Sequence, residues 1–591
     1  MSHTRPILIA TLLAAAGTLQ AQEVSVEALD PTLDLPLVTD LPVEPVAVEQ
    51  AVPSTNVTVN LIGRLVQKGI LSQAEAVEMI QQAEAEALVA QTAAARVDAL
   101  PEAGADDLRV TYIPEVVRND MRDEIKQELM AQARQEKWSE KSSPDWTSKF
   151  RPFGDIRGRY ESTFFDEGND NSGAFPNFGA INGGAPFDTS GTQFSPQHNV
   201  DQDRHRARLR ARIGTEIMLG NGFNGGIRLA TGDSSSPTST NQTFGSSGGN
   251  FSKYSIWLDR AFLSYDAGPG DGEELLFLAG RFDNPFFSTD MQWDEDVGFD
   301  GLAVRGKVKI NDCLTTFFTA GYFPVYNTDF NFATNQPTKF ESTDKWLTGA
   351  QIGLEWKISE DLTAKFGVSY YNFDAIEGKL SSPFTPLTTS DAGDTDTTRP
   401  SFAQRGNTYM ALRDIVPNAA NNFGSQFQYQ YYGLASEFRN LTITGRLDYD
   451  AYDPYRLTLL GEATKNLAFD NSAIATKAVN NRGPSSTGVG AFEGGDTAWN
   501  LALQFGKPAL QAFGDWQASF GYRYVESDAV VDGFTDSDFG GGGTNLKGFS
   551  LGGSMALSPV VRAGVRWMSA DEVIGSPLST DTLQLDISAK F

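Results

Sequence analysis

Five arginines at alternating positions restrict the fold of this chain more than any other feature. They occupy every second position from residue 204 to residue 212, and mostly apolar residues lie between them. Successive side chains of a β-strand point to opposite faces, so the segment predicts a strand with one cationic face. A packed core cannot accommodate a row of unpaired charges, whereas a water-filled lumen can. The arginines are Arg204, Arg206, Arg208, Arg210 and Arg212.

The same alternation recurs near both ends of the region that follows residue 150. In residues 154–161, apolar residues and glycine share one face, and charged residues, including Arg157 and Arg159, occupy the other. Residues 583–591 alternate between apolar and polar side chains and end on an aromatic, an ending that is familiar from outer-membrane barrels. We expect this segment to close a barrel through Leu583, Leu585, Ile587 and Phe591.

Further alternating segments are joined in turn by short turns and long polar loops. This asymmetry is typical of bacterial barrels, with short periplasmic turns and long extracellular loops. The predicted fold class is all-β: a transmembrane antiparallel β-barrel of about 16 strands, within a range of 14–18, with a small α-helical N-terminal periplasmic segment. The strands are expected at 153–163, 204–218, 224–231, 254–265, 275–285, 302–309, 314–323, 346–357, 362–373, 427–445, 455–466, 497–506, 516–526, 547–557, 560–569 and 582–591.

Two of these segments need a further assumption. Residues 427–445 are interpreted as one bent strand because bacterial single-chain barrels have even strand numbers. In residues 254–265, Arg260 has the phase of Leu258 and would face lipid. A β-bulge there would restore the register and turn Arg260 inward.

Composition excludes several other classes of protein. With three His and one Cys, the chain has little basis for a zinc site, a disulfide framework or haem attachment, so no metal ligands are assigned. A net charge of −28 argues against binding to nucleic acid. Beyond the N-terminus no run of about 18 apolar residues occurs, which argues against membrane-spanning helices.

The region before residue 150 differs from the rest. Residues 1–21 have the pattern of a secretory signal peptide. Residues 22–55 are acidic and Pro-rich and predict an extended linker. Residues 56–140 show helical spacing and predict a periplasmic helical segment with coiled-coil character, ahead of a barrel over 150–591. This segment could be an oligomerisation stalk, a peptidoglycan contact or a hairpin that packs on itself.

Several motifs resemble those of the putative porins of Gram-negative outer membranes. The resemblance implies an outer-membrane location, surrounding lipid and passive passage of solutes, and it includes no catalytic motif. By analogy with general porins, we also expect a homo-oligomer, a trimer, and insertion by the barrel assembly machinery through the last strand. The motifs lie at 59–76, 112–118, 155–160, 534–540 and 543–548, with the closing Phe591.

Two sets of charged residues are candidates for the pore lining. One is the basic row of Arg157, Arg159 and the five alternating arginines, which Arg228, Arg281 and Arg305 continue on neighbouring strands. The other is the acidic loop at 291–300, the third long loop. In general porins this loop folds inward, so its acids would face the arginines and create a transverse field that sorts ions. The candidate constriction residues are Asp294, Glu295, Asp296 and Asp300.

Other interpretations of these charges stay open. The arginines could pair with carboxylates of adjacent strands, which does not exclude a role in the pore. The acidic loop could be an ordinary solvated loop. Its oxygens, or those of Asp536, Asp538 and Asp571, could also bind calcium, and no other cofactor is expected.

The sequence favours a water-filled channel for passive diffusion of ions and small hydrophilic solutes, and not an enzyme. One alternative is a structural protein that links the barrel to the cell wall through the N-terminal helices. A less favoured alternative is a barrel enzyme that uses His198 or His205 as a base.

Overall fold

The computed structural model describes residues 147–591, except 247–248, 269, 271, 329–330, 333–338 and 485–489. The signal peptide, linker and helical segment expected at 1–21, 22–55 and 56–140 lie outside the described residues. Within the described part of the chain, no helix has the length and apolarity needed to span a membrane.

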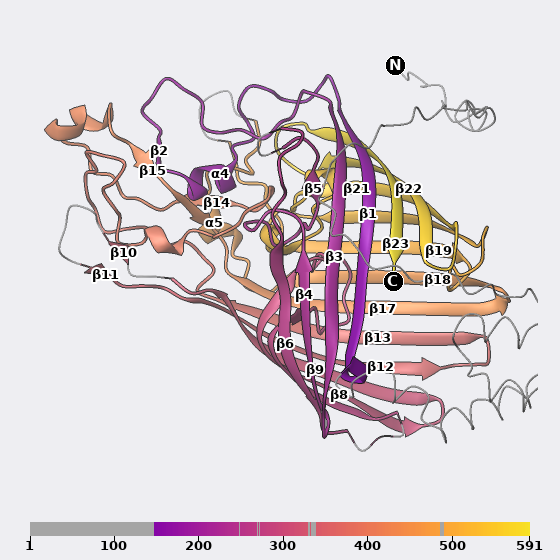
Figure 1. Ribbon diagram of the computed structural model, residues 1–591. Coiled ribbons are helices and arrows are strands. Elements are labelled where there is room, and N and C mark those ends of the chain that lie inside the picture. The colour runs from indigo at the N-terminus through magenta and orange to yellow at the C-terminus, as the bar shows by residue number, and fades with distance from the viewer. Residues whose placement is uncertain are drawn as a thin grey trace, which may run out of the picture. The chain divides into compact units, whose positions relative to one another are not determined.

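Sixteen long strands form one closed antiparallel β-barrel (Figure 1). Each pairs with the next barrel strand along the chain, and the last pairs with the first. This confirms the predicted fold class and strand number. The barrel strands are β1 (Phe150–Phe165), β3 (Arg204–Gly220), β4 (Phe223–Ala230), β6 (Trp257–Asp266), β7 (Glu274–Asp283), β8 (Gly298–Asn311), β9 (Leu314–Tyr326), β12 (Lys345–Lys357), β13 (Leu362–Asp374), β17 (Phe438–Tyr452), β18 (Tyr455–Asn466), β19 (Thr497–Gly506), β20 (Trp516–Val525), β21 (Leu546–Ala556), β22 (Val561–Glu572) and β23 (Ser579–Lys590).

The two faces of the strands differ in chemistry. On β1, Ile156 and Tyr160 are 49% and 46% exposed on the outer face, whereas Arg157 and Arg159 are buried on the inner face. Alternation of side chains along a strand produces this division. The outer face therefore suits lipid, and the inner face carries the charges.

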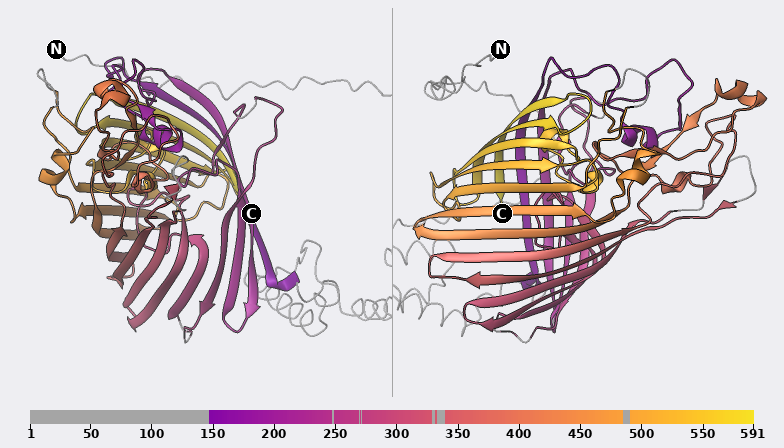
Figure 2. Two further views of the ribbon diagram at one scale, coloured as in Figure 1. Left: turned by 90° about the vertical axis from the view of Figure 1, so that its left-hand side faces the viewer. Right: turned by 180° about the vertical axis from the view of Figure 1, so that it is seen from behind.

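Long loops gather at one end of the barrel, and short turns lie at the other (Figures 1 and 2). Two long loops matter most below: L3 (residues 284–297) and L7 (residues 526–545). The smaller elements are η1 (Thr147–Lys149), α4 (Phe178–Gly183), β2 (Phe187–Asp188), β5 (Gln242–Thr243), β10 (Asn331–Phe332), β11 (Lys339–Phe340), η2 (Asp396–Thr398), β14 (Tyr409–Ala411), η3 (Ala419–Gly424), β15 (Tyr429–Gln430), β16 (Tyr432–Leu434), α5 (Asn471–Ala475), η4 (Asp532–Phe534) and η5 (Phe539–Gly541).

The single bent strand predicted at 427–445 is wrong in its position. The barrel strand β17 begins only at Phe438. The preceding residues pair within the loops instead, where β15 pairs with β2 and β16 pairs with β14. Alternation of apolar and polar residues indicates that a segment is a strand, but it does not indicate which sheet the strand joins. Counting one barrel strand in this stretch was nevertheless correct.

The β-bulge predicted in β6 is confirmed. Arg228 of β4 pairs with Arg260, whereas the next residue, Leu229, pairs with Leu258, so Asp259 is the extra residue. Leu258 is 58% exposed on the outer face, and Arg260 is 2% exposed and bonded to the Asp259 carboxylate. The bulge thus turns Arg260 into the interior.

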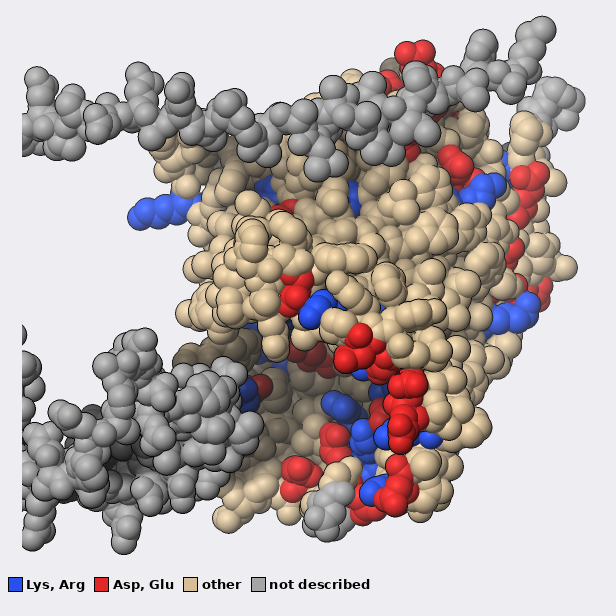
Figure 3. All heavy atoms as spheres, turned by 90° about the vertical axis from the view of Figure 1, so that its right-hand side faces the viewer, with Lys and Arg blue, Asp and Glu red and all other residues tan. Residues whose placement is uncertain are grey.

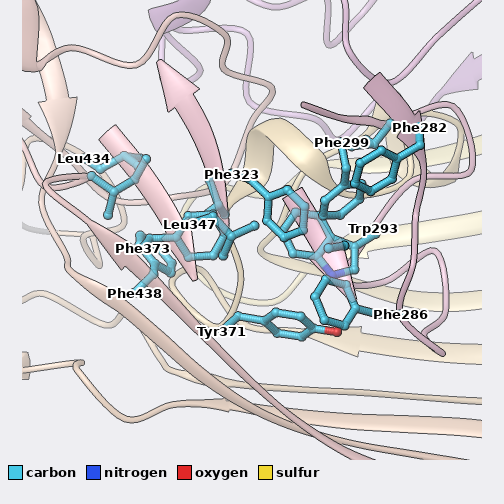
Figure 4. Packing of buried hydrophobic residues seen from close by; sticks show 14 of the residues in the cluster. Phe282, Phe286, Trp293, Phe299, Phe323, Leu347, Tyr371, Phe373, Leu434 and Phe438 are labelled. Carbon is cyan, nitrogen blue, oxygen red and sulfur yellow. The ribbon is translucent and has the colours of Figure 1, made fainter. Parts of the chain in front are cut away.

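Aromatic side chains fill one side of the barrel interior (Figure 4). Phe286 and Trp293 of L3 pack edge to face against Tyr371 of β13, with ring centroids 5.1 and 5.4 Å apart. Edge-to-face pairs at such distances are favourable. This aromatic cluster fixes L3 against the inner wall. Its other members include Phe282, Phe299, Phe323, Leu347, Phe373, Leu434 and Phe438.

Candidate functional site

The arginine wall, defined as Arg157 and Arg159 of β1 with the five alternating arginines of β3, forms one inward surface. The register places Arg157 opposite Arg210 and Arg159 opposite Arg208. Every second side chain of a strand points to the same face, so these residues share the inner face. The structure therefore brings together the two arginine segments that the sequence singled out.

Carboxylates of β1 pair with most of the β3 arginines. Glu161, which is 3% exposed, pairs with Arg206 and Arg208. Asp155 accepts hydrogen bonds from the Nε atoms of Arg210 and Arg212 at 3.0 and 2.7 Å. Arg204, at the loop end of β3, is exposed. The arginine wall is thus largely a network of cross-strand ion pairs.

The remaining predicted arginines lie on β4, β7 and β8, further around the barrel. Each is paired with a carboxylate of a neighbouring strand. Asp300, which was expected in the constriction loop, instead lies on β8, outside L3, and pairs with Arg281. The nitrogen–oxygen distances are 2.6 Å for Arg228–Asp259, 3.0 Å for Arg228–Asp283, 2.7 Å for Arg281–Asp300 and 3.8 Å for Arg305–Glu274.

Loop L3 folds into the barrel and is bonded to opposite walls. On one side, Asp296 accepts a hydrogen bond from Arg212 Nη1 at 3.2 Å. On the other side, Thr289 donates its backbone N–H and its hydroxyl to Glu462 of β18, each at 2.9 Å. Together with the aromatic cluster, these contacts hold L3 across the lumen and narrow it.

Glu295 and Asp296 of L3 contact the arginine wall directly. Glu295 Oε1 lies 3.0 Å from Arg210 Nη1, and its side chain remains 71% exposed. Asp296 is buried and also accepts hydrogen bonds from the backbone and hydroxyl of Thr240. These acids and arginines touch, so no open gap separates them.

Asp294 contacts another loop instead of the arginine wall. Its carboxyl accepts hydrogen bonds from the backbone N–H groups of Asp296 and Ser537 at 2.8 and 3.1 Å. Burial, together with the nearby Asp536 charge, raises the pKa of Asp294 to about 9. Asp294 is therefore protonated at neutral pH and adds no charge to the constriction.

Loop L7 is a second loop that folds inward. The sequence marked its 534–540 segment only as a family-like motif. Its backbone runs beside L3: Asp294 N–H donates to Phe534 O at 2.8 Å, and Asp536 N–H donates to Asp290 O at 2.9 Å. L3 and L7 therefore form one layer within the lumen.

Salt bridges tie L7 to the barrel wall. Asp538 contacts Arg159 at 2.7 Å, and Asp536 contacts Arg523 of β20 at 3.2 Å. Although burial alone would raise the pKa of Asp538, the charges of Arg159 and Arg566 lower it below its usual range. Sequence reasoning missed Arg523 and Arg566. Their phase is the signal that could have found them: Arg523 alternates with Tyr522 and Tyr524 on β20, and Arg566 alternates with Val565 and Trp567 on β22.

A cavity of about 370 Å³ lies between L3, L7 and the barrel wall. Arg157, Arg159 and Arg566 line one part of it, together with acids of both loops. Figure 3 looks onto the end of the barrel with the short turns, where charged side chains gather around a hollow. Neutral or small residues of β19–β22 line the rest, among them Gln504, Gln517, Ser519, Gly552, Ser554 and Gly564.

The described residues assemble no metal centre. Among them, no group of three or more His, Cys, Asp or Glu side chains could hold a metal ion, so the calcium hypothesis finds no support in this part of the chain. His205 Nδ1 lies 3.0 Å from Ser162 Oγ. His198 lies in the loop before β3, where desolvation and the charge of Arg405 lower its pKa to about 4.

The closing motif lies on β23 and directly after it. Leu585 and Ile587 are 43% and 62% exposed on the outer face, and Leu583 has the same phase. Phe591 follows the strand. Its N–H donates to Gly154 O at 3.0 Å, and its carbonyl accepts from Gly154 N–H at 2.9 Å. The pairing of β23 with β1 therefore continues through Phe591.

Among solved structures, the chain is similar to the high-pH structure of Pseudomonas putida OprB. That match has 12% identity and a TM-score of 0.41, and it covers 77% of this chain and 97% of that chain. The chain is also similar to the outer membrane channel DcaP of Acinetobacter baumannii (11%, TM-score 0.34, coverage 75% and 97%). A third similar structure is Salmonella typhi OmpF in complex with daunomycin (12%, TM-score 0.34, coverage 75% and 97%).

A comparison with curated proteins finds no similar sequence. A family model described as "putative porin" matches residues 55–591, which include the whole barrel with L3 and L7. Because this match extends over most of the sequence, the chain belongs to the putative porin family.

Proposed function

We propose that the protein lets ions and small hydrophilic solutes diffuse passively through a water-filled channel in the outer membrane. The observation that carries the proposal is the polar cavity between L3, L7 and the barrel wall. Barrels of about sixteen strands are wide enough for an aqueous channel. L3, L7 and the aromatic cluster reduce that width, so the cavity is the proposed constriction.

The arginine wall and the acids of L3 are the proposed selectivity elements. Fixed charges along a pore sort ions by their sign. Most of these charges are paired, but Glu295 keeps a largely exposed side chain beside Arg210. Whether the channel prefers cations or anions therefore depends on the small net charge that remains after most acids and arginines have paired.

Single-channel current tests the proposal. The purified mature protein is placed in a planar bilayer under a tenfold KCl gradient. We expect discrete current steps without any added factor, and the reversal potential reports which charge dominates. A barrel that inserts but conducts no current would contradict the diffusion pore and favour the structural alternative.

Neighbouring residues of β21 offer a matched pair of variants. Gly552 lines the cavity, whereas Leu551 does not line it and is exposed on the outer face. Gly552→Phe would place a ring in the cavity and should lower the unit conductance. Leu551→Phe would place the same ring on the outer face and should leave the conductance unchanged. Equal conductance in both variants would locate the ion path elsewhere.

We also propose the assembly that the sequence favours. Residues 22–55 and 56–140 would extend into the periplasm, where the helices could reach peptidoglycan. The barrel would be inserted through β23 by the barrel assembly machinery and would form a trimer. Molecular mass in mild detergent tests the trimer, and retention of the full chain on peptidoglycan tests the wall contact.

A further inference from the structure

We infer that the constriction holds a binding site for an oxyanion, a carboxylate or phosphate group of a small hydrophilic solute, with Arg157 as its anchor. The inference rests on the proposed diffusion pore and adds the chemical class of the solute.

Arg157 differs from the other inward arginines of β1 and β3 because, within the described residues, its side chain pairs with no carboxylate. Its guanidinium donates one hydrogen bond, from Nη2 to Asn241 Oδ1 at 2.7 Å, and its Nε has no partner. The residue is 9% exposed and lines the cavity. A buried cation with unused donors is unfavourable, so an anion in the cavity would stabilise it.

Two other arginines lie beside Arg157, and both are already paired with acids. Arg159 follows it on the inner face of β1, and Arg210 lies opposite it on β3. The closest acids are already committed, since Asp538 and Asp586 both contact Arg159 at 2.7 and 2.8 Å. Among the described residues, Arg157 therefore has no ion-pair partner of its own.

The same cavity offers a second cation and neutral hydrogen-bonding groups. Arg566 Nη2 lies 3.7 Å from Asp536, beyond hydrogen-bond distance, and its side chain is 35% exposed. Gln517, Ser519 and Ser554 also line the cavity. Guanidinium groups suit carboxylates and phosphates, and amides and hydroxyls suit the hydroxyls of a solute. These groups together fit a small polyhydroxy anion.

Block of the KCl current tests the site. Gluconate and inorganic phosphate should reduce the current in a saturable way, whereas neutral glucose at the same concentration should not. Arg157→Gln should raise the half-blocking concentration about tenfold or more, because a hydrogen bond to a charged group is lost. Arg157→Lys keeps the charge and should have a smaller effect. Comparing gluconate with phosphate tells which oxyanion the site prefers.

Arg305→Gln is the matched control. Arg305 is an inward arginine of β8 whose nearest acid, Glu274, is 3.8 Å away, and it does not line the cavity. This variant should leave the block unchanged. Equal block in the wild type and in Arg157→Gln, or equal block by glucose, would overturn the inference without affecting the diffusion pore.

Calorimetric titration of the full chain in detergent separates the two proposals. If the protein binds gluconate or phosphate through Arg157 but conducts no current, the proposed binding site is supported and the proposed diffusion pore is contradicted. A protein that conducts but binds neither probe overturns the site alone. Heat-modifiable gel mobility checks that Arg157→Gln retains its barrel, and Arg157→Lys provides the same comparison if it does not.

Discussion

At the scale of single residues, paired charges determine what a substitution does. Arg206 and Arg208 share Glu161 as an ion-pair partner, and Arg210 and Arg212 share Asp155. Removing one member of a buried pair leaves the other uncompensated, which typically destabilises a protein by about 3–5 kcal/mol. A lost arginine therefore removes one positive charge and leaves the shared carboxylate with one cationic partner fewer.

Replacing Arg206, Arg208 and Arg210 by Gln should shift the ion selectivity toward cations. Glu161 and the exposed Glu295 would lose their partners, so the lumen would become more negative. Under a tenfold KCl gradient, the reversal potential should move by on the order of 10 mV, against a limit of about 59 mV. An unchanged potential in this variant would rule out the arginine wall as a selectivity element.

The raised pKa of Asp294 makes the contact between L3 and L7 depend on pH. The packed carboxyl keeps its proton up to about pH 9, whereas a solvated one loses it near pH 4. The free energy of packing therefore falls by up to about 1.4 kcal/mol per pH unit between these values.

Open-channel current noise should accordingly rise from pH 5 to pH 9. Asp294→Asn keeps an acceptor but cannot ionise, so its noise should depend less on pH. Burial also raises the pKa of Asp528 and Asp532 of L7 to about 6 and 7, so a residual dependence is expected in the variant. Identical pH profiles would show that Asp294 does not control the loop contact.

The sequence identified the arginine wall, but it could not identify all the partners of these residues. Phase along a strand determines which face a side chain occupies, and this was sufficient for Arg157 and for Arg260 with its bulge. The pairing of Glu161 with Arg206 depends on the register between two strands, which phase does not specify. The contact of Asp294 with Ser537 joins loops that are far apart in the sequence.

At the scale of elements, L3 and L7 fold into the lumen that the strands enclose and line its cavity. L3 is held by the aromatic cluster, by the arginine wall and by Glu462. The sequence predicted an inward third loop by analogy but gave no sign that L7 would join it. The backbone hydrogen bonds between the two loops involve main-chain groups, which every residue carries, so composition does not reveal them.

Glu462→Ala should release the far side of L3. Glu462 accepts the Thr289 N–H and the hydroxyls of Thr289 and Thr444. Leaving a buried donor unsatisfied costs about 1–3 kcal/mol, so L3 should become mobile and the conductance larger and noisier. Glu462→Gln keeps a carbonyl acceptor and should behave more like the wild type. Single-channel recordings that do not distinguish Glu462→Ala from the wild type would contradict this anchoring role.

At the scale of the whole molecule, the seam between β23 and β1 closes the barrel. Phe591 extends that seam by two backbone hydrogen bonds to Gly154, and its ring lies close to the same glycine. Phe591→Ala should therefore lower the temperature at which the barrel unfolds in heat-modifiability gels and reduce the amount found in the outer membrane. Phe591→Tyr keeps the ring and serves as the control. Equal unfolding temperatures for the wild type and the alanine variant would exclude a role of the ring at the seam.

The number of strands and the closure of the barrel could be predicted from the alternation of apolar and polar residues and from the requirement for an even strand number. That requirement arises because an antiparallel barrel must return to its first strand. The sequence did not predict that aromatic side chains fill one side of the interior. Inward aromatic residues such as Phe323 and Phe373 look the same in sequence whether they contact a loop or water. Inward folding of the loops adds partners for both: Phe286 of L3 packs on Phe323, and Trp293 of L3 and Phe534 of L7 pack on Phe373.

The aromatic filling also separates positions that evolution must keep from positions it can change. Residues such as Trp293 and Tyr371 hold a loop and a wall together, so their replacement would disturb folding. Ser519, Gly552 and Gly564 face the cavity, and each could be exchanged for a larger or differently polar residue one at a time. If the proposed diffusion function holds, a lineage carrying this barrel can change which solutes pass by point mutations along three adjacent strands, without altering the contacts that hold L3 in place.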